Sequence, residues 1–203
     1  MSEARGGTVT NENEVDLFPL MTVLFPGGPL PLRIFEPRYL DMVARCLRES
    51  RPFGVVLIAE GGETGSATLN EFGTTAMITD WYPGNDGLLG VTAQGQQRFR
   101  LLESRPRSDG LHVGAIEIVP EPEARALPER DRCLAEVLEE LLDKSGSHYD
   151  SIPKNYGDAG WVSDRLAEVL PISLQMRQRC LELANPEERL QLLRPVLERL
   201  RVA

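Results

Sequence analysis

The sequence predicts an α+β protein in which a small, mostly antiparallel β-barrel with one early helix precedes a C-terminal helical part. Short apolar and β-branched runs, separated by glycine, asparagine and aspartate turn signals, continue as far as Val119. After a stretch rich in proline and glutamate, apolar residues recur at helical spacing. We therefore divide the chain into a disordered tail (1–15), a β-barrel subdomain (16–119), a connector (120–127) and a helical subdomain (128–203).

The apolar, proline-rich run from Leu17 to Met42 predicts the first elements. Its prolines remove backbone donors at fixed points, which favours a first strand near Leu20–Leu24, a Pro-Gly-Gly-Pro turn and a short edge strand at Leu30–Ile34. A helix is expected to begin at Pro37, because the first helical position does not need a backbone N–H. Three apolar residues then fall at the spacing of a helix: Leu40, Val43 and Leu47.

The strands that follow are short and are bounded by turns. Phe53–Ala59 is a continuous apolar run typical of a central strand, and Thr74–Trp81 predicts a second strand. Turn signals at residues 83–87 and 108–110 flank the remaining runs. These runs are Leu88–Ala93, Gln97–Glu103 and His112–Val119. Together they predict a closed or nearly closed barrel.

The helical part is predicted from periodicity and from start signals. Helices are expected at Pro128–Lys144, at Trp161–Leu170 and from Asn185 onward. Ser173 can cap the helix that precedes Asn185, since a serine side chain accepts from the first free N–H groups. Pro195 is expected to kink or split the last helix, because proline removes an internal hydrogen bond.

The opening run resembles the start of the Lon amino-terminal domain family, the substrate-recognition domain that precedes the ATPase and protease parts of Lon. The motifs that carry this resemblance are Phe18-Pro19-Leu20, Phe25-Pro26-Gly27 and Leu32–Tyr39. It continues at Phe53–Ile58, Gly73–Ile78, Arg98-Phe99-Arg100 and Trp161–Pro171, and so covers nearly the whole chain from Asp16. The resemblance implies a PUA-like β-barrel followed by a helical bundle, and partners that are proteins or unfolded peptide segments.

Charge and cysteine content exclude several classes of function. The net charge of −9 argues against broad, non-specific nucleic-acid binding, which needs a basic surface. We expect no membrane span and no secretory signal, because apolar runs of about eighteen residues and an apolar N-terminal segment are both missing. Cys46, Cys133 and Cys180 are scattered, which favours reduced thiols in a cytoplasmic protein.

The sequence shows no pattern typical of catalysis. His112 and His148 form no zinc-ligand spacing with the cysteines, and no Gly-x-Ser-x-Gly elbow is present. The loop Glu60–Gly65 lacks the Gly-Lys-Ser/Thr ending of a phosphate-binding loop, and its two glutamates repel phosphate. The ATPase and serine–lysine protease motifs of full Lon are not found either. We therefore predict a protein that is not an enzyme, with no catalytic residues, no metal ion and no cofactor.

Candidate binding residues gather in the opening run, where Arg33, Glu36, Arg38 and Tyr39 are the polar and amphipathic members. Glu36 precedes the predicted helix, where a negative charge meets the helix dipole favourably, and it is close in sequence to both arginines. Two interpretations stay open. The group is either an ion-pair cluster that locks strand to helix or a contact for a partner.

Aromatic residues supply two further candidate surfaces. Trp81 and Tyr82 lie beside a hairpin turn, where they either anchor a peptide or cover the end of the barrel. Tyr149, Tyr156 and Trp161 flank the long loop next to the helical part. A groove is expected at the boundary between the two subdomains, because such junctions often bind ligands.

Two functions from different classes fit these observations. The resemblance implies a non-catalytic module that docks extended protein segments on exposed apolar and aromatic groups, with backbone pairing at a free strand edge. The alternative is RNA binding, for which PUA-like barrels are used elsewhere, through a basic patch of Arg98, Arg100, Arg105 and Arg107. Pairing of these four arginines with acidic residues removes the support for RNA. An enzyme with a small-molecule pocket is a third class, for which the sequence offers no pattern.

Overall fold

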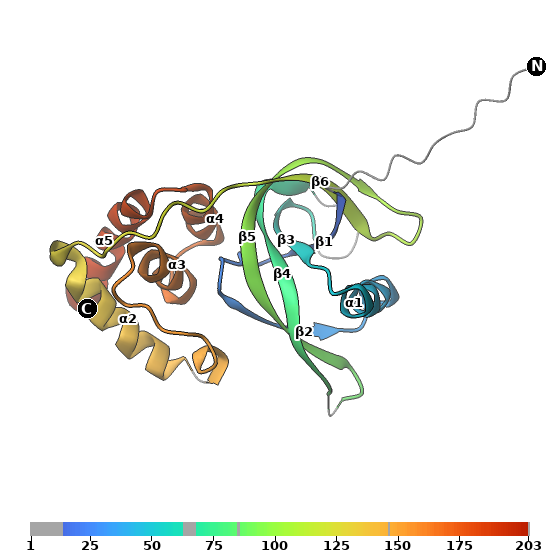
Figure 1. Ribbon diagram of the computed structural model, residues 1–203, viewed down its shortest axis with the longest axis horizontal. Coiled ribbons are helices and arrows are strands. Elements are labelled where there is room, and N and C mark those ends of the chain that lie inside the picture. Colours follow the sequence, from blue (N-terminus) through green and yellow to red (C-terminus); the bar gives the residue numbers. More distant parts are fainter. Residues whose placement is uncertain (1–13, 63–67, 85, 146, 203) are drawn as a thin grey trace, which may run out of the picture.

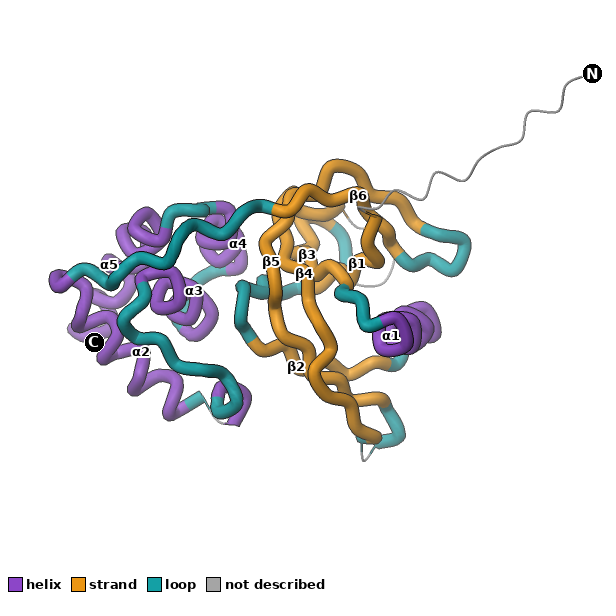
Figure 2. Tube along the Cα trace, in the orientation of Figure 1, coloured by secondary structure: helices purple, strands orange, loops and turns teal. Residues whose placement is uncertain are grey.

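The computed structural model describes residues 14–62, 68–84, 86–145 and 147–202, so residues 1–13 of the expected tail lie outside the described residues. The described chain forms two parts (Figure 1). Strands β1–β6 and helix α1 (Pro37–Glu49) make one part, and helices α2–α5 make the other. The loop that follows β6 runs from the strands across to the helices (Figure 2).

The strands pair into a mostly antiparallel sheet, as predicted. Their bounds are β1 Glu14–Leu20, β2 Pro29–Ile34, β3 Phe53–Glu60, β4 Thr68–Pro83, β5 Leu89–Pro106 and β6 His112–Ile118. The order along the sheet is β2-β5-β4-β3-β1-β6. The second half of β5 also pairs with β6. The strands β5, β4, β3, β1 and β6 therefore form a closed ring of pairings. β1 and β3 run parallel, which is possible because the long connection through β2 and α1 separates them.

The helices that start at Pro37, Leu174 and Pro186 begin at the local signals that the sequence contains, whereas those expected at Pro128 and Trp161 start at Arg132 and Ala159. The remaining bounds are α2 Arg132–Lys144, α3 Ala159–Val169, α4 Leu174–Glu182 and α5 Pro186–Val202, with 3-10 turns η1 Glu129–Asp131 and η2 Ser147–Tyr149. Pro37 occupies the first turn of α1, and the Ser173 hydroxyl accepts a hydrogen bond from Met176 N (3.2 Å) at the start of α4. None of the described helices is long and apolar enough to cross a membrane.

Two strand predictions differ from the structure. β1 lies at residues 14–20 rather than at Leu20–Leu24, because β3 and β6 pair with this earlier segment. Leu24 instead lies in a buried loop, and its carbonyl accepts a hydrogen bond from Thr74 Oγ1 at 2.6 Å. The runs Leu88–Ala93 and Gln97–Glu103 form the single long strand β5, which pairs with β2 along its first half and with β6 along its second.

One helix prediction also differs, and for another the structure excludes one of two alternatives. The buried side of α1 consists of Tyr39, Met42, Val43 and Cys46, whereas Leu40 and Leu47 are exposed. Pro195 does not split α5, which continues as one helix to Val202. Pro195 lies on the exposed side of α5, where the carbonyl that loses its helical donor can bind water.

The two parts pack on each other through an apolar core. One cluster fills the space between the strands and α1, where Met42, Phe53 and Val91 are fully buried. Another cluster lies among α2–α5 and includes Phe25 and Leu57 from the strand part. The helical part therefore lies directly against the sheet and supports it from one side.

Candidate protein-binding surface

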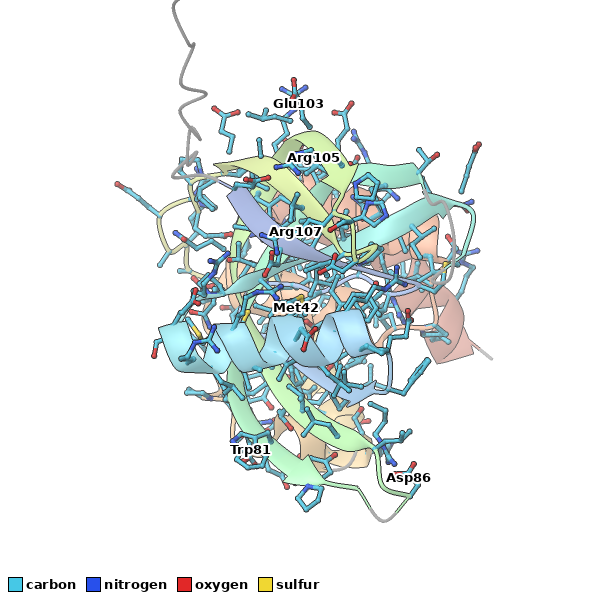
Figure 3. All side chains as sticks on the ribbon, turned by 90° about the vertical axis from the view of Figure 1, so that its right-hand side faces the viewer. Met42, Trp81, Asp86, Glu103, Arg105 and Arg107 are labelled. Atoms are coloured by element: carbon cyan, nitrogen blue, oxygen red, sulfur yellow. The ribbon has the colours of Figure 1, made fainter. Side chains whose placement is uncertain are left out.

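Helix α1 covers the side of the strands that faces away from α2–α5 (Figure 1). Figure 3 looks at this side: α1 crosses in front of the strands, with the β4–β5 hairpin that carries Trp81 and Asp86 on one side of it and Arg105 and Arg107 on the other. Met42, on the side of α1 that faces the strands, is completely buried. The helix is thus a fixed part of this surface, since its buried side belongs to the core.

One flank of α1 is closed by arginine contacts. Arg38 Nη1 donates to Gly110 O in the β5–β6 hairpin at 2.9 Å, and Arg38 also pairs with Glu36 at 2.7 Å. One turn before the helix ends, Arg45 Nη2 donates to the buried carboxylate of Asp16 in β1 at 3.1 Å. These contacts tie α1 to β1 and to the β5–β6 hairpin.

The opposite flank of α1 is apolar and open. Leu40 and Leu47 lie on the other side of the buried stripe from Arg38 and Arg45, since successive helical residues turn by about 100°. Trp81 pairs with Val91, so its side chain lies on the same sheet face as this core residue. The exposed fractions are 37% for Leu40, 40% for Leu47, 58% for Trp81 and 63% for Phe35, which links β2 to α1. We name these four residues the α1–hairpin face.

The structure separates the other residues that the sequence proposed as a site. Arg33 does not join Glu36 and Arg38 but pairs with Asp86 on the β4–β5 hairpin. Tyr39 is buried, and its ring stacks on Phe18 with the ring centroids 4.0 Å apart. Tyr82 pairs with Gly90 on the opposite sheet face from Trp81, and its ring lies over that glycine. Of the six proposed residues, Trp81 contributes its side chain to the α1–hairpin face.

A buried ion network holds the strands and helices in one arrangement. Arg98 of β5 is nearly inaccessible, and its Nη2 donates to Asp164 Oδ1 of α3 at 2.6 Å. Arg98 Nη1 donates to the Glu121 carboxylate in the connector at 2.5 Å. The buried Arg189 of α5 approaches the same Asp164 oxygen at 3.1 Å. Because each buried charge has an opposite partner, the network can persist at low dielectric constant.

A second buried contact fixes the turn at residues 26–29. Arg165 Nη2 of α3 donates to Pro26 O at 2.8 Å and to Glu168 Oε1 at 2.9 Å. The Tyr149 hydroxyl donates to the other Glu168 oxygen at 3.1 Å. Burial raises the pKa of Glu168 to about 7, although the neighbouring Arg165 acts in the opposite direction. Gly28 lies so close to this carboxylate that a Cβ atom would overlap it, so the turn needs glycine there.

The arginines proposed for RNA contact are all paired with acidic residues. Arg100 lies 3.6 Å from Glu71, Arg105 lies 2.6 Å from Glu14, and Arg107 lies 3.2 Å from Asp16. Arg98 is buried in the network described above. The patch therefore offers phosphates little uncompensated positive charge, and the RNA hypothesis loses the feature on which it depended.

The described residues offer little for catalysis. They include no group of histidine, cysteine, aspartate and glutamate side chains placed to hold a metal ion. Burial raises the pKa of both Cys46 and Cys180 to about 11, so both stay protonated thiols at neutral pH. Burial and the nearby Arg38 lower the pKa of His112, which favours the neutral ring. The Glu60–Gly65 loop lies partly outside the described residues.

The expected groove at the boundary of the two parts exists, but other residues line it. A pocket of about 450 Å³ lies between the sheet and α4. Its lining includes Met21, Leu57 and Ile58 on the sheet side and Leu174, Gln178 and Arg179 on the helix side. Of the three aromatic residues proposed for this boundary, Tyr156 and Trp161 instead pack edge to face, 5.1 Å apart, against the helical core. We name this cavity the junction pocket.

Comparison with known proteins shows which family this geometry belongs to. Residues 14–199 match the family described as the ATP-dependent protease La (LON) substrate-binding domain. The crystal structure of a Lon N-terminal domain protein from Xanthomonas campestris is 38% identical in sequence, with a TM-score of 0.75. The match covers 89% of this chain and 96% of that chain.

Two curated relatives are similar over only part of their own length. Protein cereblon from Gallus gallus is 33% identical over an alignment of 135 residues, which covers 63% of this chain and 29% of that cereblon. Lon protease from Anaeromyxobacter dehalogenans is 26% identical over an alignment of 187 residues, which covers 89% of this chain and 22% of that protease. The chain therefore spans less than a third of either relative. These matches confirm the resemblance carried by the opening run, and the chain belongs to the LON substrate-binding domain family.

Proposed function

We propose that this protein is a non-catalytic recognition module that binds other proteins or unfolded peptide segments, and that the α1–hairpin face is its contact surface. The observation that carries the proposal is the exposure of four large apolar side chains on α1, on the link before it and on the β4–β5 hairpin: Phe35, Leu40, Leu47 and Trp81. Large apolar side chains exposed together mark an interaction surface more often than a solvent surface. The family's description as a substrate-binding domain supports the same function.

The physical mechanism is burial of apolar surface against a partner. Trp81 is the expected anchor, because tryptophan combines a large contact area with few rotatable bonds and is enriched among interface hot spots. An unfolded segment exposes the apolar side chains that such a surface can cover, whereas a folded protein buries most of them. The module therefore prefers unfolded chains without reading a particular sequence.

Further parts of the proposal concern architecture and location. We propose that the ring of strand pairings from β5 to β6 is a PUA-like β-barrel and that α2–α5 form a helical bundle. We also propose that the protein works in the cytoplasm. The buried free thiols of Cys46 and Cys180 support a reducing compartment.

Replacement of Trp81 tests the proposed surface. The probe is fluorescently labelled, reduced and alkylated α-lactalbumin, which stays unfolded, and its binding is followed by fluorescence anisotropy. Trp81→Ala is expected to weaken binding roughly 30-fold, which corresponds to about 2 kcal/mol, because a central aromatic anchor is lost.

Leu102→Ala is the matched control, since Leu102 is an equally exposed apolar residue (56%) on the second half of β5. It is expected to leave the affinity unchanged. Equal losses for the two variants, or no loss for Trp81→Ala, would contradict the assignment of this face.

A further inference from the structure

The junction pocket lies where one strand pairing stops short. β1 pairs with β3 only as far as Leu20 with Leu57, whereas β3 continues to Glu60. In the described part of the chain, residues 58–60 therefore have no strand partner on the β1 side. Ile58 and Ala59 of this free edge line the pocket. An extended peptide can add itself to such an edge through backbone hydrogen bonds.

The pocket is built to receive an apolar side chain. Met21, Leu57 and Leu174 line it, and a thioether and leucines adapt well to aliphatic or aromatic groups. The charged residues in its lining are Arg179 and Glu182, which pair with each other at 3.2 Å. Because their charges are opposite, the lining favours neither a positively nor a negatively charged ligand. Its volume of about 450 Å³ is near the lower end for ligand sites and fits one large side chain with its adjoining backbone.

A buried polar group in the lining lacks a partner. Gln178 is 4% exposed, and its Oε1 atom has no hydrogen-bond donor among the described residues. Its amide nitrogen donates to Phe72 O at 3.1 Å and to Glu182 Oε1 at 3.5 Å. Both partners are acceptors, so the amide orientation is fixed and the oxygen must find its donor elsewhere. A buried acceptor without a donor is costly, so the lining of the pocket is short of one hydrogen-bond donor.

From these three observations we infer that the junction pocket is a second polypeptide site, which takes one large aliphatic or aromatic side chain of an extended segment paired with the free edge of β3. The inference rests on the proposed function, because the occupant of the junction pocket is a polypeptide. The pocket adds a binding preference that the α1–hairpin face does not supply. The bound segment must be extended and must place a large apolar side chain in the pocket.

Filling the pocket tests this inference. Ala59→Phe places a ring in the pocket from an exposed position, so the core is left intact. The matched control is Ala124→Phe, at an exposed alanine in the connector. Thermal unfolding followed by circular dichroism verifies that both variants fold. Affinity for the unfolded α-lactalbumin probe is then measured for each variant alone and combined with Trp81→Ala.

We expect Ala59→Phe to weaken binding roughly tenfold and Ala124→Phe to leave it unchanged. We also expect the Ala59→Phe and Trp81→Ala effects to add, since the two sites share no residues. In hydrogen–deuterium exchange, the probe should slow exchange of the amides at residues 58–60 in the wild-type chain but not in Ala59→Phe.

Two results would overturn the inference in distinguishable ways. If Ala59→Phe binds like the wild type while Trp81→Ala loses affinity, the pocket is not a polypeptide site, but the proposed function stands. If the wild-type chain does not bind the unfolded probe, the proposed function fails and the inference falls with it.

Discussion

At the scale of single residues, the structure shows how neighbours change the chemistry of one side chain. Glu168 carries a carboxylate into the contact between α3 and the turn at residues 26–29, where its side chain is 9% exposed. Burial raises its pKa from 4.5 to about 7, although Arg165 and the Tyr149 hydroxyl both favour the charged form. The stability of the folded chain must therefore depend on pH through this residue.

The direction of that dependence follows from proton binding. Between pH 4.5 and about 7 the folded chain keeps a proton on Glu168 that the unfolded chain has released. Stability contributed by this group is therefore complete below pH 4.5 and is lost as the pH rises through about 7. The whole span is on the order of 3 kcal/mol, taking about 1.4 kcal/mol per pKa unit.

Glu168→Gln isolates this effect, because the amide does not titrate. Urea unfolding of both proteins across this pH range should show the wild type losing stability relative to Glu168→Gln as the pH rises. A difference in unfolding free energy that stays constant with pH would mean that Glu168 does not titrate there.

At the scale of elements, α1 shows why a helical pattern does not reveal which side is buried. Leu40, Val43 and Leu47 share helical spacing, but the structure buries the side centred on Met42 and Cys46 instead. Tyr39, Met42, Val43 and Cys46 belong to the apolar core beneath the helix, while Arg38 and Arg45 reach Gly110 and Asp16 on one flank, and these contacts together fix the rotation of α1 on the sheet. Two leucines consequently remain in solvent and become available for binding.

Truncation of one buried and one exposed side chain of α1 tests which side of the helix faces the core. Met42→Ala should destabilise the protein by about 2–5 kcal/mol, because it leaves a cavity in a fully buried position. Leu47→Ala should change the unfolding free energy by less than about 0.5 kcal/mol, as is usual for surface positions. Urea unfolding gives both values, and similar losses for the two variants would contradict the observed buried side.

At the scale of the whole molecule, the Arg98 network joins segments that are far apart in the sequence. It connects β5, the connector, α3 and α5 around one buried carboxylate. The network fixes the helical part against the sheet, and the junction pocket lies along the same boundary. The two parts are therefore expected to unfold together.

Arg98→Met tests this coupling. Removing the guanidinium leaves Asp164 and Glu121 with less compensation, which should cost about 3–5 kcal/mol. Arg100→Met, which breaks an exposed pair with Glu71, should cost no more than about 1 kcal/mol. Chemical unfolding provides the comparison, and a small loss for Arg98→Met would show that the network does not hold the two parts together.

Local signals made several features predictable. Pro37 and Ser173 mark helix starts that the structure confirms, because a missing N–H or a capping hydroxyl acts within one turn of the chain. The exposure of Trp81 could be suggested from its position beside a turn. Gln178 could not be found in this way, since nothing in its own helix indicates that its amide oxygen is left without a donor.

The sequence by itself determined the family, the order of most strands and helices and several of their ends, because these depend on residues that are close together in the chain. Only the tertiary structure decided which apolar side chains stay exposed and which charges are paired. Arg98 and Asp164, for example, are 66 residues apart in the sequence, and no local pattern links them. Strand register and helix rotation bring such residues together, and both are set by packing across the whole molecule.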